Sequence, residues 1–247
     1  MGKYFTVTVK PLIPASNQAE AAFADGDVLF DWTAFDIPKG AANLINATII
    51  SKTADGTVNS HALNLYFAKS RDAGTTAPVT IGDWHETADG TTASLNQIIG
   101  ACASEESDKF VGLDYATIQA LGGGSLALWR NGIILQGEPE SGTNVGYDKL
   151  YVAGVSVDGT PTFASTVTCT GVQATSQAVL TVGTIHATKV FSVGDVLHDE
   201  DDRLLGTVKS VDGTTQMTMT ANLENATVNA KDVYCINPIT LILQFEK

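Results

Sequence analysis

The segment YFTVTVK, residues 4–10, alternates apolar and polar side chains along its whole length. Phe5, Val7 and Val9 fall on one side, and threonine and lysine fall on the other. The segment ITLILQFE, residues 239–246, repeats this pattern at the opposite end of the chain. An alternation of period two is typical of a β-strand with one buried face. We therefore predict that the two ends of the chain lie in one sheet, where they can pair with each other.

Strand signals continue through the first 160 residues. They occupy residues 44–52, 61–69, 125–130, 133–136 and 149–157. Asp55-Gly56 and Asn131-Gly132 stand between neighbouring runs and suit tight hairpin turns, because glycine accepts positive φ. Short helices are expected at residues 95–103 and 115–121, the second ending at three glycines. This part of the chain, residues 1–161 with residues 238–247, is predicted to form a larger, jelly-roll-like β-sandwich.

The pattern changes near Pro161, where aromatic residues become scarce and the strand signals shorten. Candidate strands are residues 167–172, 178–182, 189–191, 195–198, 204–211 and 216–220. An acidic turn at residues 199–202 and Asp212-Gly213 separate successive strands. Residues 162–237 are therefore predicted to form a small SH3-like or OB-like β-barrel, inserted before the last strand of the sandwich. The fold class expected for the whole chain is all-β.

The charge balance restricts the possible partners. The 247 residues include 27 acidic and 14 basic side chains, for a formal net charge of −13. Such a surface repels nucleic acid and anionic membranes, so neither is expected as a partner. The sequence contains no apolar stretch of about 20 residues and no signal-peptide core. Synthesis in a reducing cytoplasm is the expectation that follows.

The spacing of the cysteines and the absence of the standard catalytic motifs argue against an enzyme. Cys102, Cys169 and Cys235 are odd in number and widely spaced, which disfavours a disulfide scaffold or a zinc site. The sequence lacks the nucleophile elbow, the zinc-binding H-E-x-x-H, the phosphate-binding P-loop and the dinucleotide fingerprint. We therefore predict no catalytic, cofactor-binding or metal-binding residue, and no enzyme. The paired carboxylates of a glycoside hydrolase need only proximity in space, which local sequence patterns do not reveal, so an enzyme remains an alternative function.

Two features have a structural and a functional interpretation. The run Asp199-Glu200-Asp201-Asp202 is expected to be a solvated hairpin tip, with a calcium site as the alternative, although its spacing differs from that of a calcium-binding loop. Trp32, Trp84 and Trp129 are expected to pack in the core, with exposed platforms for sugars or proteins as the alternative.

Several short motifs resemble virion structural proteins of tailed marine bacteriophages. They are WTAFDIPKG at residues 32–40, LYFAKS at 65–70, GYDKLYVAG at 146–154, FSVGDVL at 191–197, GTVKS at 206–210 and NPITLIL at 237–243. The resemblance implies a capsid decoration (cement) protein that binds the outer face of the major capsid protein lattice and stabilises the head. It brings no catalytic or metal residues with it.

The resemblance sets the expected location and partners. The protein would be made in the host cytoplasm and would lie on the capsid exterior of the virion, bound to the major capsid protein. Self-association is expected, with a trimer at a local threefold axis as one arrangement. The alternative function is a carbohydrate- or receptor-binding module of the tail or baseplate.

Overall fold

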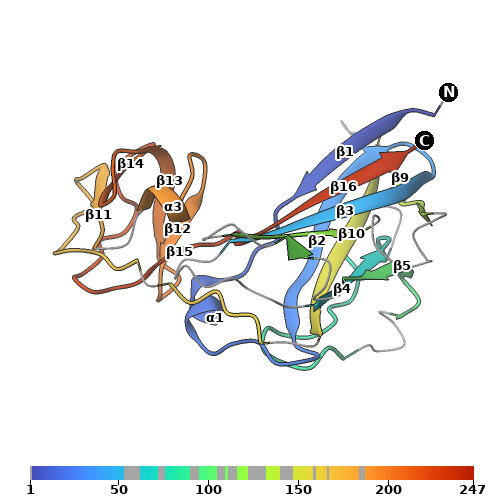
Figure 1. Ribbon diagram of the computed structural model, residues 1–247, viewed down its shortest axis with the longest axis horizontal. Coiled ribbons are helices and arrows are strands. Elements are labelled where there is room, and N and C mark those ends of the chain that lie inside the picture. The colour runs from blue at the N-terminus through green and yellow to red at the C-terminus, as the bar shows by residue number, and fades with distance from the viewer. Residues whose placement is uncertain are drawn as a thin grey trace.

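The chain folds into two β lobes (Figure 1). The computed structural model describes residues 2–52, 62–71, 76–89, 95–104, 109–110, 116–121, 132–139, 147–157, 160–165, 167–183 and 187–247. Strands dominate this part of the chain, which confirms the all-β prediction. In the same residues, no helix has the length and apolar character needed to cross a membrane. Both termini lie in the larger lobe.

The first sheet of the large lobe contains both ends of the chain. Its strand order is β1 (Tyr4–Val9), β16 (Ile239–Glu246), β3 (Ala42–Lys52), β7 (Ala116–Leu121) and β6 (Lys109–Phe110), and β8 (Ile133–Leu135) also pairs with β3. β1 runs antiparallel to β16, with a register from Tyr4 opposite Glu246 to Val9 opposite Leu241. The predicted pairing of the chain ends is therefore confirmed.

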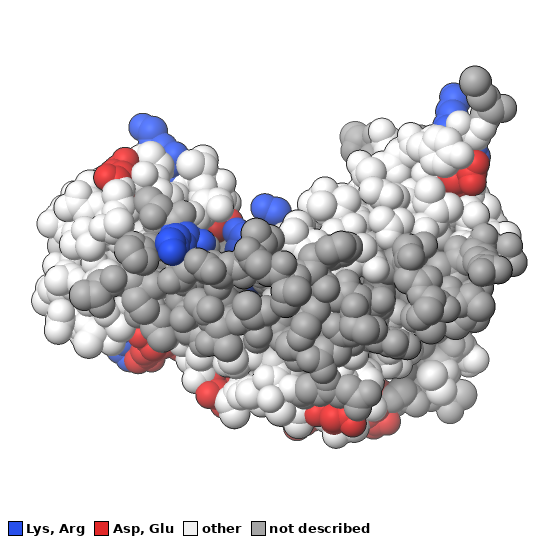
Figure 2. All heavy atoms as spheres, in the orientation of Figure 1, with Lys and Arg blue, Asp and Glu red and all other residues white. Residues whose placement is uncertain are grey.

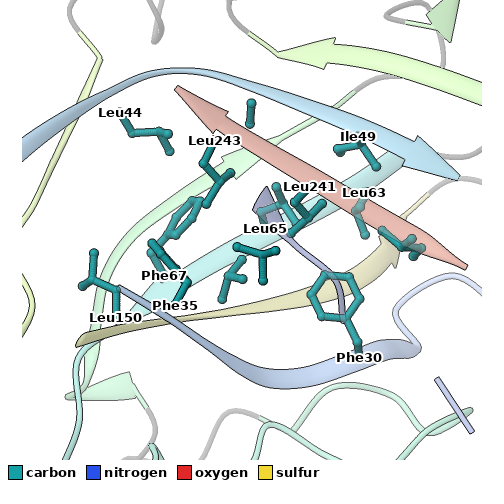
Figure 3. Packing of buried hydrophobic residues seen from close by; sticks show 14 of the residues in the cluster. Phe30, Phe35, Leu44, Ile49, Leu63, Leu65, Phe67, Leu150, Leu241 and Leu243 are labelled. Atoms are coloured by element: carbon teal, nitrogen blue, oxygen red, sulfur yellow. The ribbon is translucent and has the colours of Figure 1, made fainter. Parts of the chain in front are cut away.

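The second sheet of the large lobe completes a β-sandwich. Its order is β2 (Val28–Pro38), β10 (Tyr147–Val157), β4 (Ala62–Ala68) and β5 (Ile98–Ala103), with β9 (Glu138–Pro139) paired to β10. Leu241 and Leu243 of β16 share one buried cluster with Leu65 and Phe67 of β4, so the core lies between the sheets (Figure 3). Burial of these apolar side chains is the main force that holds the sandwich together.

Gly154 in the middle of β10 makes room for this core. A Cβ atom at this position would lie 2.3 Å from the ring of Phe30, which is fully buried on β2. The pairing of β10 with β2 is irregular on both sides of Gly154. A glycine therefore allows the aromatic ring to lie directly against the β10 backbone.

The small lobe is built on a third antiparallel sheet. Its order is β11 (Val179–Thr181), β14 (Gln216–Met219), β13 (Leu204–Val211), β12 (Val196–Asp199) and β15 (Val233–Cys235). Its separate core includes Leu180, Leu197, Leu205 and Met217. Cys169 bridges to Val182 after β11, and Thr168 bridges to Asp232 before β15. The segment at residues 167–170 thus contacts both edges of the sheet, although no described strand closes it into a complete barrel.

Three local predictions were wrong. The helices expected at residues 95–103 and 115–121 are the strands β5 and β7, and the strand expected at residues 189–191 belongs to the helix α3 (Ala187–Val190). Short apolar runs fit a helix or a strand equally well, and tertiary pairing decides between them. β5 pairs with β4 and β7 pairs with β3, so each gains a ladder of backbone hydrogen bonds.

The predicted hairpin between residues 44–52 and 61–69 was also wrong, because β3 and β4 lie in different sheets. β2 and β15 were not predicted at all. The strand expected at residues 125–130, Asn131 and the turn at Asp55-Gly56 lie outside the described residues.

Candidate interaction surfaces and the lobe junction

The acidic loop between β12 and β13 is held by ion pairs. Asp199 is fully buried and accepts hydrogen bonds from the backbone N–H groups of Asp201 (3.2 Å) and Arg203 (3.1 Å). Its Oδ2 lies 2.6 Å from Nη2 of Arg203. Lys231 lies against Glu200 and Asp201, its Nζ being 3.2 Å from Oδ2 of Asp201. The ion pairs of Arg203 and Lys231 with these carboxylates hold the loop in one conformation.

The interpretation of this loop as a solvated tip therefore needs correction. Residues 199–202 do form the turn of a hairpin and Asp201 is exposed as expected, but Asp199 is buried, and Arg203 and Lys231 pair with three of the four carboxylates. Hydrogen bonding to Glu200 and Asp201 raises the pKa of Lys231, which keeps it protonated. In the described residues no group of three histidine, cysteine or acidic side chains could hold a metal ion.

The fourth acidic residue of the loop connects the two lobes. Asp202 accepts a hydrogen bond from the backbone N–H of Ser16 (3.0 Å) and a second, short one from the Ser16 hydroxyl. Ser16 lies in helix α1 (Ala15–Ala19) of the large lobe. A charged acceptor strengthens such hydrogen bonds. The loop is thus a clamp between the lobes.

Two further polar contacts reinforce this junction. Lys52 at the end of β3 lies 3.0 Å from both carboxylate oxygens of Asp195, which is 6% exposed and precedes β12. The side-chain amide of Gln18 donates to the carbonyl oxygens of Ile13 (2.7 Å) and Cys235 (2.9 Å). Ser16–Asp202, Lys52–Asp195 and Gln18–Cys235 are called the junction contacts below.

Apolar side chains fill the space between these contacts. A cavity of about 20 Å³ remains, with room for about one water molecule. It is lined by residues of both lobes, including Phe163, Phe191, Tyr234 and Pro238. Figure 2 shows that the surface is hollowed between the lobes on the side opposite α1. The junction therefore combines close packing with polar contacts, of which those of Gln18 are buried.

A groove of about 450 Å³ lies across the neighbouring strands β1, β16 and β3. Tyr4 is 69% exposed, and its hydroxyl donates to Oε1 of Glu246 (3.0 Å). Phe5 is half-buried and stacks on Phe245 with 5.1 Å between ring centroids. The groove is lined by Tyr4, Phe5, Thr6, Ile45, Gln244 and Phe245. An aromatic edge is therefore partly open to solvent at this end of the large lobe.

A second exposed apolar surface lies on the small lobe. Val172 and Val179 are 72% and 40% exposed and line one groove of about 430 Å³. Gln173 pairs antiparallel with Thr227, and both are buried. The next pair along, Val172 and Val228, therefore lies side by side with its side chains facing solvent. No charged side chain lines this groove among the described residues.

The described tryptophans are held by packing. Trp32 is half-buried, and its Nε1 donates to the carbonyl oxygen of Val79 (2.8 Å). Trp84 is half-buried against the main core. Trp129 lies outside the described residues. The arrangement of Trp32 and Trp84 differs from the exposed aromatic platform that a sugar-binding module would present.

The three cysteines are free thiols in the structure. Cys169 and Cys235 are buried, Cys102 is half-buried, and burial raises the pKa of each. For Cys169 and Cys235 the raised pKa is about 11. Because the thiolate is the reactive form, these two thiols are poor nucleophiles at neutral pH.

Comparison with known proteins gives little further information. No family model matches the sequence, and no curated protein matches it. Two similar solved chains come from infectious bursal disease virus, one in the structure of its Gx strain (8% identity, TM-score 0.24) and one in its VP2 subviral particle (9%, 0.16). The alignments cover 99% of this chain but only 40% and 41% of those chains. TM-scores this low carry no argument about fold or function.

Proposed function

We propose that this chain is a non-enzymatic structural protein of a virus particle, most specifically a decoration protein bound to the outer face of the capsid. The observation that carries the proposal is the fixed junction between the two lobes. A decoration protein stabilises a shell by bridging neighbouring subunits, and a bridge resists strain only if its parts do not hinge. The junction contacts supply this rigidity, because they connect elements far apart in the sequence through the buried Gln18–Cys235 bond, the half-buried Lys52–Asp195 ion pair and the exposed Ser16–Asp202 bonds.

The surface chemistry supports the same proposal. The grooves at β1 and at Val172 are shallow surfaces suited to flat protein contacts. The cavity at the junction holds about one water molecule, which is far below the volume of a substrate site. A net charge of −13 fits a partner whose exposed surface is neutral or basic.

The mechanism that follows is stoichiometric. Each copy would occupy a fixed position on the coat lattice, with the two lobes on neighbouring subunits. The free energy of this binding is then lost when the subunits separate, which raises the barrier to opening the shell. Both lobes must bind, and their relative orientation must be maintained, for this stabilisation to occur.

The test uses capsids that lack the chain, incubated with the purified protein. We expect saturable binding at a fixed number of copies for each coat subunit, and release of the genome at a higher temperature. A variant with the junction weakened by Lys52→Met and Asp202→Asn should bind but stabilise less. Gln216→Thr, a change at an exposed position of β14 away from the junction, is the matched control. Failure of the native protein to bind would overturn the proposal.

A further inference from the structure

The outward edge of β1 carries backbone groups that no described element pairs with. Lys3 and Lys247 exchange both of their backbone hydrogen bonds (3.0 and 2.9 Å). Because bonding direction alternates along an antiparallel strand, Phe5, Val7 and Val9 also face β16. The N–H and C=O groups of Tyr4, Thr6 and Thr8 therefore point away from the sheet. All three residues are exposed.

We propose that β1 pairs antiparallel with β1 of a second copy of this chain, with Thr6 on the two-fold axis. An unpaired strand edge is a template for another strand, and sheet extension gives main-chain affinity without a preformed pocket. In this register Thr6 faces Thr6 of the second copy, and Tyr4 faces Thr8. Each of these pairs exchanges two backbone hydrogen bonds. The two six-stranded sheets would then become one continuous sheet.

The side chains of β1 are self-complementary in this register. Phe5 of one copy lies opposite Val7 of the other, so two half-buried apolar residues cover each other on the core-facing side. An aromatic and a β-branched side chain form a favourable cross-strand pair. The same contact would shield the part of the groove formed by Phe5.

Charge complementarity supports a second copy as the occupant. The register places Lys10 of the second copy opposite Gly2. Glu246 lies directly over Gly2, since a Cβ atom on Gly2 would be 2.5 Å from its Oε1. The missing side chain thus leaves room for the lysine to approach this carboxylate, and the symmetry repeats the ion pair twice. The same register places Lys3 opposite Val9, so no lysine of β1 or its flanks directly faces a lysine of the second copy.

This contact is isologous and closes after two copies, unlike the threefold arrangement expected from the resemblance. It concerns self-association in solution, and it stands independently of binding to a particle. Blocking β1 should therefore abolish the dimer whether or not the chain decorates a capsid.

Sedimentation of the purified chain over a wide concentration range tests the proposal. We expect a reversible dimer that Thr6→Pro converts to monomer, because proline removes an outward N–H without breaking a bond to β16. Thr6→Val keeps the N–H and should remain dimeric, which controls for the fold. A monomer at every concentration, or a dimer unaffected by Thr6→Pro, would overturn the proposal.

Two further variants test the register. Lys10→Glu and Glu246→Lys should each weaken the dimer about tenfold, because each turns the two symmetry-related ion pairs into like-charge pairs, and their combination should restore it. Thr6→Cys should form an intermolecular disulfide under mild oxidation, because directly opposite residues have Cα atoms about 5.5 Å apart. Val193→Cys, at a position 70% exposed on the small lobe, is the control that should not cross-link. Cross-linking of the Val193→Cys variant alone would contradict the assigned edge.

Discussion

Asp202 in the small lobe accepts hydrogen bonds from both the backbone N–H and the hydroxyl of Ser16, a residue 186 positions earlier in the large lobe. Through these bonds the acidic hairpin of the small lobe holds the large lobe in place. Lys52–Asp195 and Gln18–Cys235 add to it from neighbouring positions. The first predictions concern this clamp, because the proposed function depends on its rigidity.

Asp202→Asn should loosen the junction while keeping the loop. Asp202 has a φ of 60°, a left-handed conformation that asparagine also tolerates, so the backbone should not be strained. The loss of the charged acceptor should cost about 1 kcal/mol in the free energy of unfolding. Limited proteolysis between the lobes should become faster, and Gln216→Thr, at an exposed position of β14 in the small lobe, should leave that rate unchanged. An unaltered rate in Asp202→Asn would show that Ser16–Asp202 does not hold the lobes.

Lys52→Met should destabilise the protein by leaving Asp195 buried without its cation. Asp195 is 6% exposed and also accepts a hydrogen bond from the backbone N–H of Ser192 (2.9 Å). We expect a loss of about 1–3 kcal/mol, measured by urea denaturation. The double variant Lys52→Met with Asp195→Asn should recover part of this loss, because the unpaired charge is gone. Equal losses in the single and double variants would contradict the buried ion pair.

Gly154→Ala should destabilise the large lobe. The added methyl group would lie 2.3 Å from the ring of Phe30, and the buried β10 strand leaves little room for movement. Overpacking of this kind costs about 1–3 kcal/mol. Combination with Phe30→Leu should reduce the penalty of the alanine. A thermal unfolding curve identical to that of the native chain would show that the close approach is absent.

The pH dependence of stability should show the contribution of the ionised Asp212 carboxylate. Hydrogen bonds from the hydroxyls of Thr218 and Ser210 lower its pKa from the usual 3.8. A folded-state pKa below the unfolded one contributes stability above pH 3.8, and this stability is lost as the pH falls through the folded pKa. Thr218→Val should therefore lower the melting temperature at pH 7, with the difference shrinking toward pH 2. A difference that stays constant with pH would contradict the role of the carboxylate.

The strands at the chain ends were predictable because their alternation is strong and local. Phe5, Val7 and Val9 point to the same side as the apolar residues of β16, and the two strands pair as expected. β5 and β7 were mistaken for helices, because short apolar runs containing Ile98 or Ile118 do not distinguish the two periods. β2 was missed since its buried residues do not alternate along its first half.

The contacts between the two lobes could not be predicted from local sequence patterns. The acidic residues at 199–202 were visible in the sequence, but their partners Ser16 and Lys231 are remote from them in the chain. Whether an acidic loop binds a cation, faces solvent or clamps a neighbouring element depends on which residues the fold brings beside it. The position of β1 at the edge of its sheet was not predictable either. The alternation of apolar and polar residues identifies a strand with one buried face, but it does not say whether that strand is central or at an edge.

Imaging of the virus particles that carry this chain, at a resolution that separates subunits, tests the proposed function most directly. We expect density for both lobes, in the relative orientation fixed by the junction contacts, repeated at equivalent positions over the outer capsid surface. Absence of this density from the particle, or its presence only at the tail, would contradict a decoration role.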